Sequence, residues 1–122
     1  MNILIFENDF SAVENTFKYV NLKYFNNSLN FTVFSKSQDI GDFKNLEHYD
    51  FIFLDITLAN RSNLDGFGIL KKIRDEKINI KKLVIITGNG DIKNRLKEQN
   101  LKDYPIILKP LPFDAIYSFL KP

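Results

Sequence analysis

YDFIFLDITL, residues 49–58, is the stretch that decides the fold. Four apolar residues in a row, Phe51–Leu54, are followed at once by Asp55. An unbroken apolar run of this length, bounded by polar residues, is typical of a strand buried on both faces in a parallel sheet, whereas a half-exposed strand alternates. The segment therefore predicts a central strand with a carboxylate at its carboxyl end.

Similar runs occur along the rest of the chain. Ile3–Phe6, Leu83–Ile86 and Ile106–Leu108 are continuous, and Phe31–Phe34 is less continuous, which suits an edge strand. The segments between them have helical spacing. Apolar stripes in three of these segments are Val13, Phe17, Val20 and Tyr24; Ile69, Leu70 and Ile73; and Phe113, Ile116 and Leu120, while 35–46 and 91–99 are weaker helices.

Five strand–helix units result from this alternation. It predicts an α/β fold with a doubly wound, five-stranded parallel sheet flanked by five helices. In such a sheet, ligands bind outside the carboxyl ends of the strands. Functional residues are therefore expected directly after the apolar runs.

Composition limits the function. The chain has 122 residues, enough for one domain at 1–122 without an output domain, and 44% of them are apolar, including 12 Phe. Its longest apolar runs of about five residues are far below the roughly 20 needed to span a membrane, so we expect a cytoplasmic protein with no membrane insertion. The absence of cysteine excludes disulfides and thiolate chemistry. The net charge of +2 comes from dispersed basic residues, which argues against a nucleic-acid partner.

The residues that follow the strands are chemically useful. An acidic cluster, a single acid, a hydroxyl and an ammonium come after four separate strands, and we expect them to converge: Glu7-Asn8-Asp9, Asp55, Thr87-Gly88 and Lys109-Pro110. This set suits phosphoryl transfer. The Asp55 carboxylate would attack phosphorus, a Mg²⁺ ion held by oxygen ligands and Lys109 would neutralise negative charge, and the Thr87 hydroxyl would donate a hydrogen bond.

Each of these residues also has a purely structural interpretation. Glu7 and Asp9 suit the start of a helix, Asp55 a turn, Thr87 the end of a strand, and Lys109 a solvated surface. Only their joint placement at four strand ends favours function. His48 lies in a polar stretch and is interpreted as a surface residue.

As a set, the segments ILIFEND, YDFIFLDITL, DGFGILKKIR, LVIITG and IILKP resemble those of the response-regulator receiver family along essentially the whole chain. The resemblance implies strand order 2-1-3-4-5 and phosphorylation of Asp55 by a histidine kinase or a histidine phosphotransfer protein. It also implies a cis bond between Lys109 and Pro110. The expected output face comprises 91–99, 106–108 and 113–120, which would contact a downstream target protein or a second copy of the chain.

Several positions depart from the family pattern. Asn8 stands where a metal-ligating Asp is expected, so we predict weak Mg²⁺ binding by Glu7, Asn8, Asp55 and the Thr57 backbone carbonyl, with Asp9 as a further candidate ligand. The loop after Asp55 has Ala59 where Pro is common and is about three residues longer than usual. Ile106 replaces the usual switch aromatic, and Tyr104 lies on the same face by period-two spacing.

The sequence thus predicts a stand-alone receiver that is phosphorylated on Asp55, hydrolyses its own phosphate slowly and acts by binding proteins. One alternative is a receiver-like binding module that works without phosphorylation, for which Asn8 and Ile106 argue. A second alternative is a phosphatase with an aspartyl nucleophile. It is disfavoured because Thr57 stands where such enzymes carry their second acid.

Overall fold

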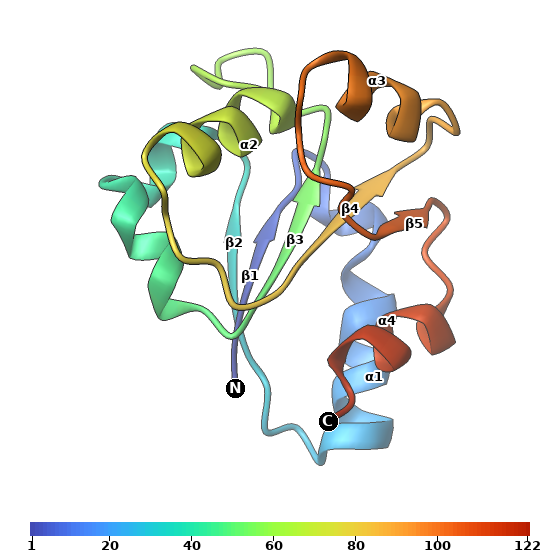
Figure 1. Ribbon diagram of the computed structural model, residues 1–122. Helices are drawn as coiled ribbons and strands as arrows, with labels where there is room; N and C mark the ends of the chain where they lie inside the picture. The colour runs from blue at the N-terminus through green and yellow to red at the C-terminus, as the bar shows by residue number, and fades with distance from the viewer.

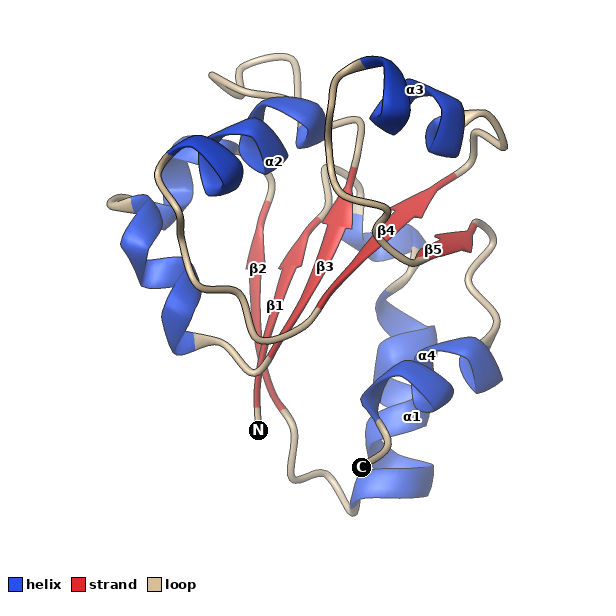
Figure 2. Cartoon of the chain, in the orientation of Figure 1, coloured by secondary structure: helices blue, strands red, loops and turns tan.

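The computed structural model describes all residues, 1–122. Its centre is a five-stranded parallel sheet in the order β2-β1-β3-β4-β5, which confirms the predicted topology (Figure 1). The strands cover each of the five predicted runs: β1 (Asn2–Phe6), β2 (Asn30–Phe34), β3 (Phe51–Asp55), β4 (Leu83–Thr87) and β5 (Ile106–Leu108). Figure 2 shows helices on both sides of this sheet.

Five helical segments flank the sheet, as predicted, but one differs in type. The α-helices are α1 (Glu14–Phe25), α2 (Gly66–Asp75), α3 (Ile92–Glu98) and α4 (Phe113–Leu120), and the short 3₁₀ helix η1 (Phe10–Ala12) precedes α1. The helix expected over 35–46 is instead a pair of 3₁₀ helices, η2 (Ser37–Ile40) and η3 (Phe43–His48).

The break between η2 and η3 has a local cause. Gly41 has φ +73°, in the left-handed region that glycine adopts without a steric penalty, so the chain turns there. The Asp42 side chain then accepts a hydrogen bond of 2.9 Å from the Lys44 amide and starts η3 anew. The expectation of one continuous helix over 35–46 was therefore wrong.

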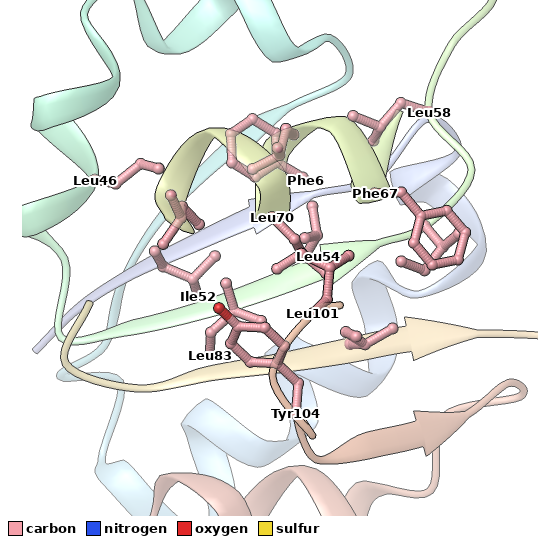
Figure 3. Packing of buried hydrophobic residues seen from close by; sticks show 14 of the residues in the cluster. Phe6, Leu46, Ile52, Leu54, Leu58, Phe67, Leu70, Leu83, Leu101 and Tyr104 are labelled. Atoms are coloured by element: carbon pink, nitrogen blue, oxygen red, sulfur yellow. The ribbon is translucent and has the colours of Figure 1, made fainter. Parts of the chain in front are cut away.

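Apolar side chains of the strands form one hydrophobic core on each face of the sheet. Successive residues point to opposite faces, so Leu54 joins a cluster of 19 buried residues beneath α2 and α3, whereas Phe53 joins a cluster of 13 beneath α1 and α4. Figure 3 shows part of the first cluster, including Leu54 of β3, Leu70 of α2 and Leu83 of β4. Because both faces of β1, β3 and β4 are covered, their runs are continuous in sequence.

The start of α2 lies against the end of β3. The Asp65 side chain caps the helix by accepting a hydrogen bond of 2.8 Å from the Gly68 amide. A Cβ on Gly66 would lie 2.5 Å from Ile56 Cα and 2.8 Å from the Asp55 carbonyl oxygen, both in the backbone. Only glycine permits this approach, which fixes the strand end that carries Asp55.

The long loop 57–65 is fastened to η2. Ser37 is buried, and its hydroxyl oxygen accepts a hydrogen bond of 3.0 Å from the Leu64 amide. The Ser37 amide donates a hydrogen bond of 2.7 Å to the Ser62 hydroxyl oxygen. The Gln38 side chain accepts from the Asn63 amide at 2.9 Å. We call this set of hydrogen bonds, made by Ser37, Gln38, Ser62, Asn63 and Leu64, the loop clasp. It holds the loop against η2.

Candidate functional site

Polar side chains are buried at the carboxyl edge of the sheet, where the predicted residues meet. Glu7 follows β1, Asp55 ends β3 and Thr87 ends β4, and their exposed fractions are only 2%, 4% and 5%. Together with Ser37 they are the only buried polar residues of the chain. Burial of polar groups is costly unless they are paired, so this group requires partners.

Lys109, which follows β5, supplies the main partner. Its Nζ lies 2.7 Å from Glu7 Oε2 and 3.1 Å from Asp55 Oδ2, and its side chain is 28% exposed. The Lys109 amide donates to the Thr87 carbonyl oxygen at 2.8 Å, which extends the β4–β5 pairing and sets the direction of the side chain. The sequence led us to expect that these residues converge, but it specified neither of the two contacts of Lys109.

Two carboxylates share one ammonium at this site. Burial raises the pKa of Glu7 and the Asp55 charge raises it further, although Lys109 acts in the opposite direction. Burial alone would lower the pKa of Lys109, but its contacts with the two carboxylates outweigh burial and raise it. The net result is a positively charged lysine beside a carboxylate pair whose charge it only partly neutralises.

The Asp55 carboxylate is held in place through both oxygens. Oδ1 accepts a hydrogen bond of 3.1 Å from the Thr57 amide, and Oδ2 accepts from Lys109. Thr57 itself is exposed. These two contacts fix the orientation of the buried carboxylate.

The site offers oxygen atoms, the type of ligand that Mg²⁺ prefers, but few of them belong to carboxylates. Glu7 Oε2 is buried and has no hydrogen-bond partner, since its short contact with Lys109 is an ion pair without hydrogen-bond geometry. A carboxylate oxygen of this sort is a suitable ligand for a hard cation. However, no group of three or more His, Cys, Asp or Glu side chains in the chain could hold a metal ion.

The remaining candidate ligands lie at the rim. Asn8 is exposed, and so is Asp9. The Asp9 carboxylate accepts the Ser11 hydroxyl at 2.7 Å, and its amide donates to Glu7 Oε1 at 3.2 Å. Asp9 therefore shapes the turn into η1 and orients Glu7, whereas its own carboxylate is directed to Ser11.

Thr87 lies beside the pair at the next strand end. Its hydroxyl oxygen accepts a hydrogen bond of 3.1 Å from the Asn89 amide, so the hydroxyl proton remains available for another acceptor. A Cβ placed on Gly88 would meet no atom within 4 Å, which leaves open space next to Thr87. The loop from 88 to 91 thus borders the site without covering it.

Ile106 and Tyr104 pack into the same core cluster, as their spacing predicted. The Tyr104 ring points inward among Leu83, Leu101 and their neighbours (Figure 3), and burial raises its pKa. Tyr104 comes just before β5, whereas Thr87 and Lys109 lie at the carboxyl ends of β4 and β5. It is therefore a core residue at the amino end of β5, away from the predicted site.

Three smaller expectations have clear outcomes. The Lys109–Pro110 peptide bond is cis, as the family resemblance implied. His48 is exposed at the end of η3, in agreement with its interpretation as a surface residue. None of the helices combines the length and the apolar character that crossing a membrane would require.

Solved structures resemble this chain over nearly its whole length. The signal receiver domain of a DNA-binding response regulator from Colwellia psychrerythraea is 22% identical, with a TM-score of 0.73 and coverage of 99% of this chain and 95% of that one. A CheY-like response regulator receiver domain protein from Methanospirillum hungatei is 18% identical, with a TM-score of 0.72 and coverage of 98% and 90%.

A third similar structure carries a metal. It is the receiver domain of the sensor histidine kinase PA1611 from Pseudomonas aeruginosa, described with a magnesium ion coordinated in the active site cleft. It is 19% identical, with a TM-score of 0.69 and coverage of 98% of this chain and 93% of that one. No protein-family model matches the sequence. No curated protein matches it either. From its structural neighbours and its sheet order, the chain has the fold of response-regulator receiver domains.

Proposed function

We propose that this chain is a signalling receiver whose Asp55 accepts a phosphoryl group from a histidine kinase or a histidine phosphotransfer protein. The observation that supports this most is the contact of Lys109 Nζ with Asp55 Oδ2 at 3.1 Å. It joins a buried carboxylate at the end of the central strand to the only cation of the site. A nucleophile that attacks a phosphoryl group needs such a counter-charge.

The chemistry follows from the orientation of Asp55. One carboxylate oxygen attacks phosphorus, and the bond from phosphorus to the donor's imidazole nitrogen breaks with its electron pair left on nitrogen. The product is an acyl phosphate on Asp55. Lys109 offsets the charge of the phosphoryl oxygens, and the Thr87 hydroxyl donates to one of them. Attack by water on phosphorus then regenerates the Asp55 carboxylate and slowly releases inorganic phosphate.

Mg²⁺ would be held by Glu7, Asn8, Asp55 and the Thr57 backbone carbonyl. When bound, it would neutralise charge between the nucleophile and the phosphoryl oxygens. We expect weak affinity, because Asn8 contributes an amide oxygen where a carboxylate would add a negative charge. Asp9 is left out of this set because its carboxylate accepts the Ser11 hydroxyl.

The phosphorylated state would act through protein contacts, with residues 1–122 as one receiver domain working in the cytoplasm. The face made by α3, β5 and α4 is the proposed surface for a downstream target or for a second copy of the chain. Leu108 of β5 and Phe113 of α4 are large apolar residues with exposed fractions of 52% and 42%, and the Phe113 ring also packs against Tyr19 of α1. The exposed Leu108 side chain is the apolar feature of this face that favours a protein interface.

Incubation with acetyl phosphate and Mg²⁺, followed by intact-mass measurement, tests the acceptor role. We expect one phosphoryl adduct on the wild-type chain and none on Asp55→Asn. The Asp75→Asn variant is the control, because it removes an exposed acid at the end of α2, outside the proposed site. Absence of an adduct that depends on Asp55 would refute phosphorylation and favour a binding module that works without it.

A second measurement separates accepting a phosphate from responding to it. Beryllofluoride mimics the phosphoryl group, and its effect on backbone amide NMR shifts can be followed residue by residue. If phosphorylation shifts a conformational population, amides of α3 and β5 will move as well as those next to Asp55. Changes confined to the surroundings of Asp55 would mean that the chain accepts the group without transmitting it to that face.

A further inference from the structure

A groove lies at the opposite edge of the sheet from Asp55. It is formed between the 77–82 loop before β4 and the 100–105 loop before β5, and its volume is about 720 Å³. In Figure 1 both loops lie at the amino ends of these strands, whereas Asp55 is at a carboxyl end. No residue of the predicted site lines this groove.

The charges that line the groove are all positive. All charged side chains that line it are cations, whereas the whole chain carries only +2: Arg74, Lys77, Lys81, Lys82 and Lys102. We call this feature the basic groove. Like charges held close together repel one another, so such a cluster favours an anionic ligand that relieves the repulsion.

Two of the cations already have partners within the protein. Arg74 donates to the Gln99 carbonyl oxygen at 3.1 Å and pairs with Asp75 at 2.8 Å, and Lys81 lies 3.6 Å from Asp50. Arg74 therefore covers the carboxyl end of α3, where a cation is favourable in any protein. These contacts need no ligand to explain them.

The other three cations take part in none of the chain's ion pairs: Lys77, Lys82 and Lys102. Lys77 follows the end of α2, so the helix dipole accounts for it in part. Lys82 directly precedes β4 and Lys102 lies in the loop before β5, beyond both helices. Lys82 Nζ lies 5.6 Å from the centroid of the Phe51 ring, and Lys102 Nζ lies 5.5 Å from that of Tyr104. These aromatic contacts leave the charges without an acidic partner, and in this sense we call the three lysines free.

The inner wall of the basic groove is apolar. Leu83, Leu101 and Tyr104 line it and lie close together at the edge of the core (Figure 3). Ile80 and Pro105 are more exposed and belong to the two loops that form the sides. An apolar wall behind free lysines suits a ligand with an apolar ring at one end and negative charge at the other.

We propose that the basic groove binds a small organic anion of this type, a nucleoside phosphate being its representative. The volume lies within the roughly 300–1,000 Å³ typical of small-molecule sites, which combine apolar walls with a few polar groups. Lysine contacts phosphate as a mobile point charge, so three free lysines can follow a flexible phosphate chain. The inference does not depend on phosphorylation of Asp55.

Amide NMR titration with ATP in the absence of divalent cations tests the proposal. We expect saturable shifts in 77–82 and 100–105 and none at Glu7, Asp55 or Thr87. Adenosine alone and inorganic phosphate alone should each bind more weakly, because each satisfies only one part of the groove. No saturable shift in the two loops, or equal binding of inorganic phosphate, would overturn the proposal.

A charge-matched pair of variants sharpens the test. The variant Lys77→Gln, Lys82→Gln and Lys102→Gln removes the free cations, and we expect about a tenfold loss of ATP affinity, since exposed charge contacts are individually weak. The control Lys36→Gln, Lys97→Gln and Lys121→Gln removes the same charge outside the groove. An equal loss of ATP affinity in both variants would mean that the net charge of the protein, and not the groove, determines binding. Binding of a Glu-rich peptide in place of ATP would replace the proposed ligand with a protein partner.

Discussion

Replacing Lys109 with methionine should destabilise the protein, because two buried carboxylates would then repel each other without a counter-ion. In the wild-type chain the Lys109 ammonium lies 2.7 Å from Glu7 and 3.1 Å from Asp55, which are 1% and 6% exposed in their side chains. Methionine keeps the apolar stem and a similar length but removes the charge. Lys109→Met therefore leaves two buried carboxylates without their counter-ion.

The size of the effect follows from burial. Removing one partner of a buried ion pair costs about 3–5 kcal/mol, because the other charge stays buried without compensation. The Lys109 side chain is 28% exposed, so water can solvate the carboxylates in part once the ammonium is gone. We therefore expect the free energy of unfolding to fall by about 3 kcal/mol, at the lower end of this range. For a domain of this size that corresponds to a fall of roughly 10 °C in the melting temperature.

The pH dependence has a definite sign. The pKa of Lys109 is raised above its ordinary 10.5, so its stabilising contribution is complete below that pH and is lost as pH rises through the folded value. Burial and the Asp55 charge raise the pKa of Glu7 in the folded chain, and Lys109→Met removes the contact that lowers it, so folded Glu7 takes up a proton more readily than unfolded Glu7. The loss of stability should therefore shrink as pH falls from 7 towards 4.5, the ordinary pKa of Glu7.

Urea denaturation followed by circular dichroism at both pH values measures this difference. The variant Lys121→Met is the control, because Lys121 is exposed and makes no ion pair. Adding Glu7→Gln to Lys109→Met should restore part of the stability by removing one of the two charges. A loss below about 0.5 kcal/mol at pH 7, or a loss of equal size at both pH values, would refute this view of the site.

Three further changes have expected outcomes. Glu7→Gln alone should raise the melting temperature at pH 7, because the folded pKa of Glu7 is raised and its ionised form is disfavoured in the folded chain. The gain should vanish below the ordinary pKa of 4.5. A lower melting temperature at pH 7 would contradict this expectation. Asn8→Asp should tighten Mg²⁺ binding by about tenfold in calorimetry, since it adds a carboxylate ligand, and unchanged affinity would place Asn8 outside the metal site. Gly66→Ala should cost about 2–3 kcal/mol in urea unfolding because the new Cβ meets backbone atoms at 2.5 and 2.8 Å, whereas Gly88→Ala, with no atom within 4 Å, should be neutral.

Much of the fold was readable because hydrophobic periodicity is a direct consequence of burial. Phe51–Leu54 lies in a strand covered on both faces, so its apolar run is unbroken and easily recognised. The region 35–46 was misjudged for the opposite reason. Its course depends on Gly41 and on the Asp42 cap, and single residues of this kind end a helix without disturbing the apolar spacing on either side.

The site was predictable as a set of strand ends but not as a set of contacts. Parallel strands bring Asp55 and Lys109 to one edge, and topology alone sufficed for that. Topology could not show that Lys109 also contacts Glu7, or that Asp9 accepts the Ser11 hydroxyl, because these depend on side-chain directions. The basic residues were interpreted only as dispersed along the chain, although Lys82 and Lys102 precede strands, a position that could have indicated the groove.

The loop clasp bears on how quickly and how tightly a partner can engage the acceptor. A loop that becomes ordered only in a complex loses conformational entropy at that moment, and this loss weakens association. Hydrogen bonds to Ser37 and Gln38 hold residues 57–65 in place, so the kinase or phosphotransfer protein proposed above would meet a preformed surface beside Asp55. Such a surface would favour partners whose shape already fits it over partners that need the loop to rearrange.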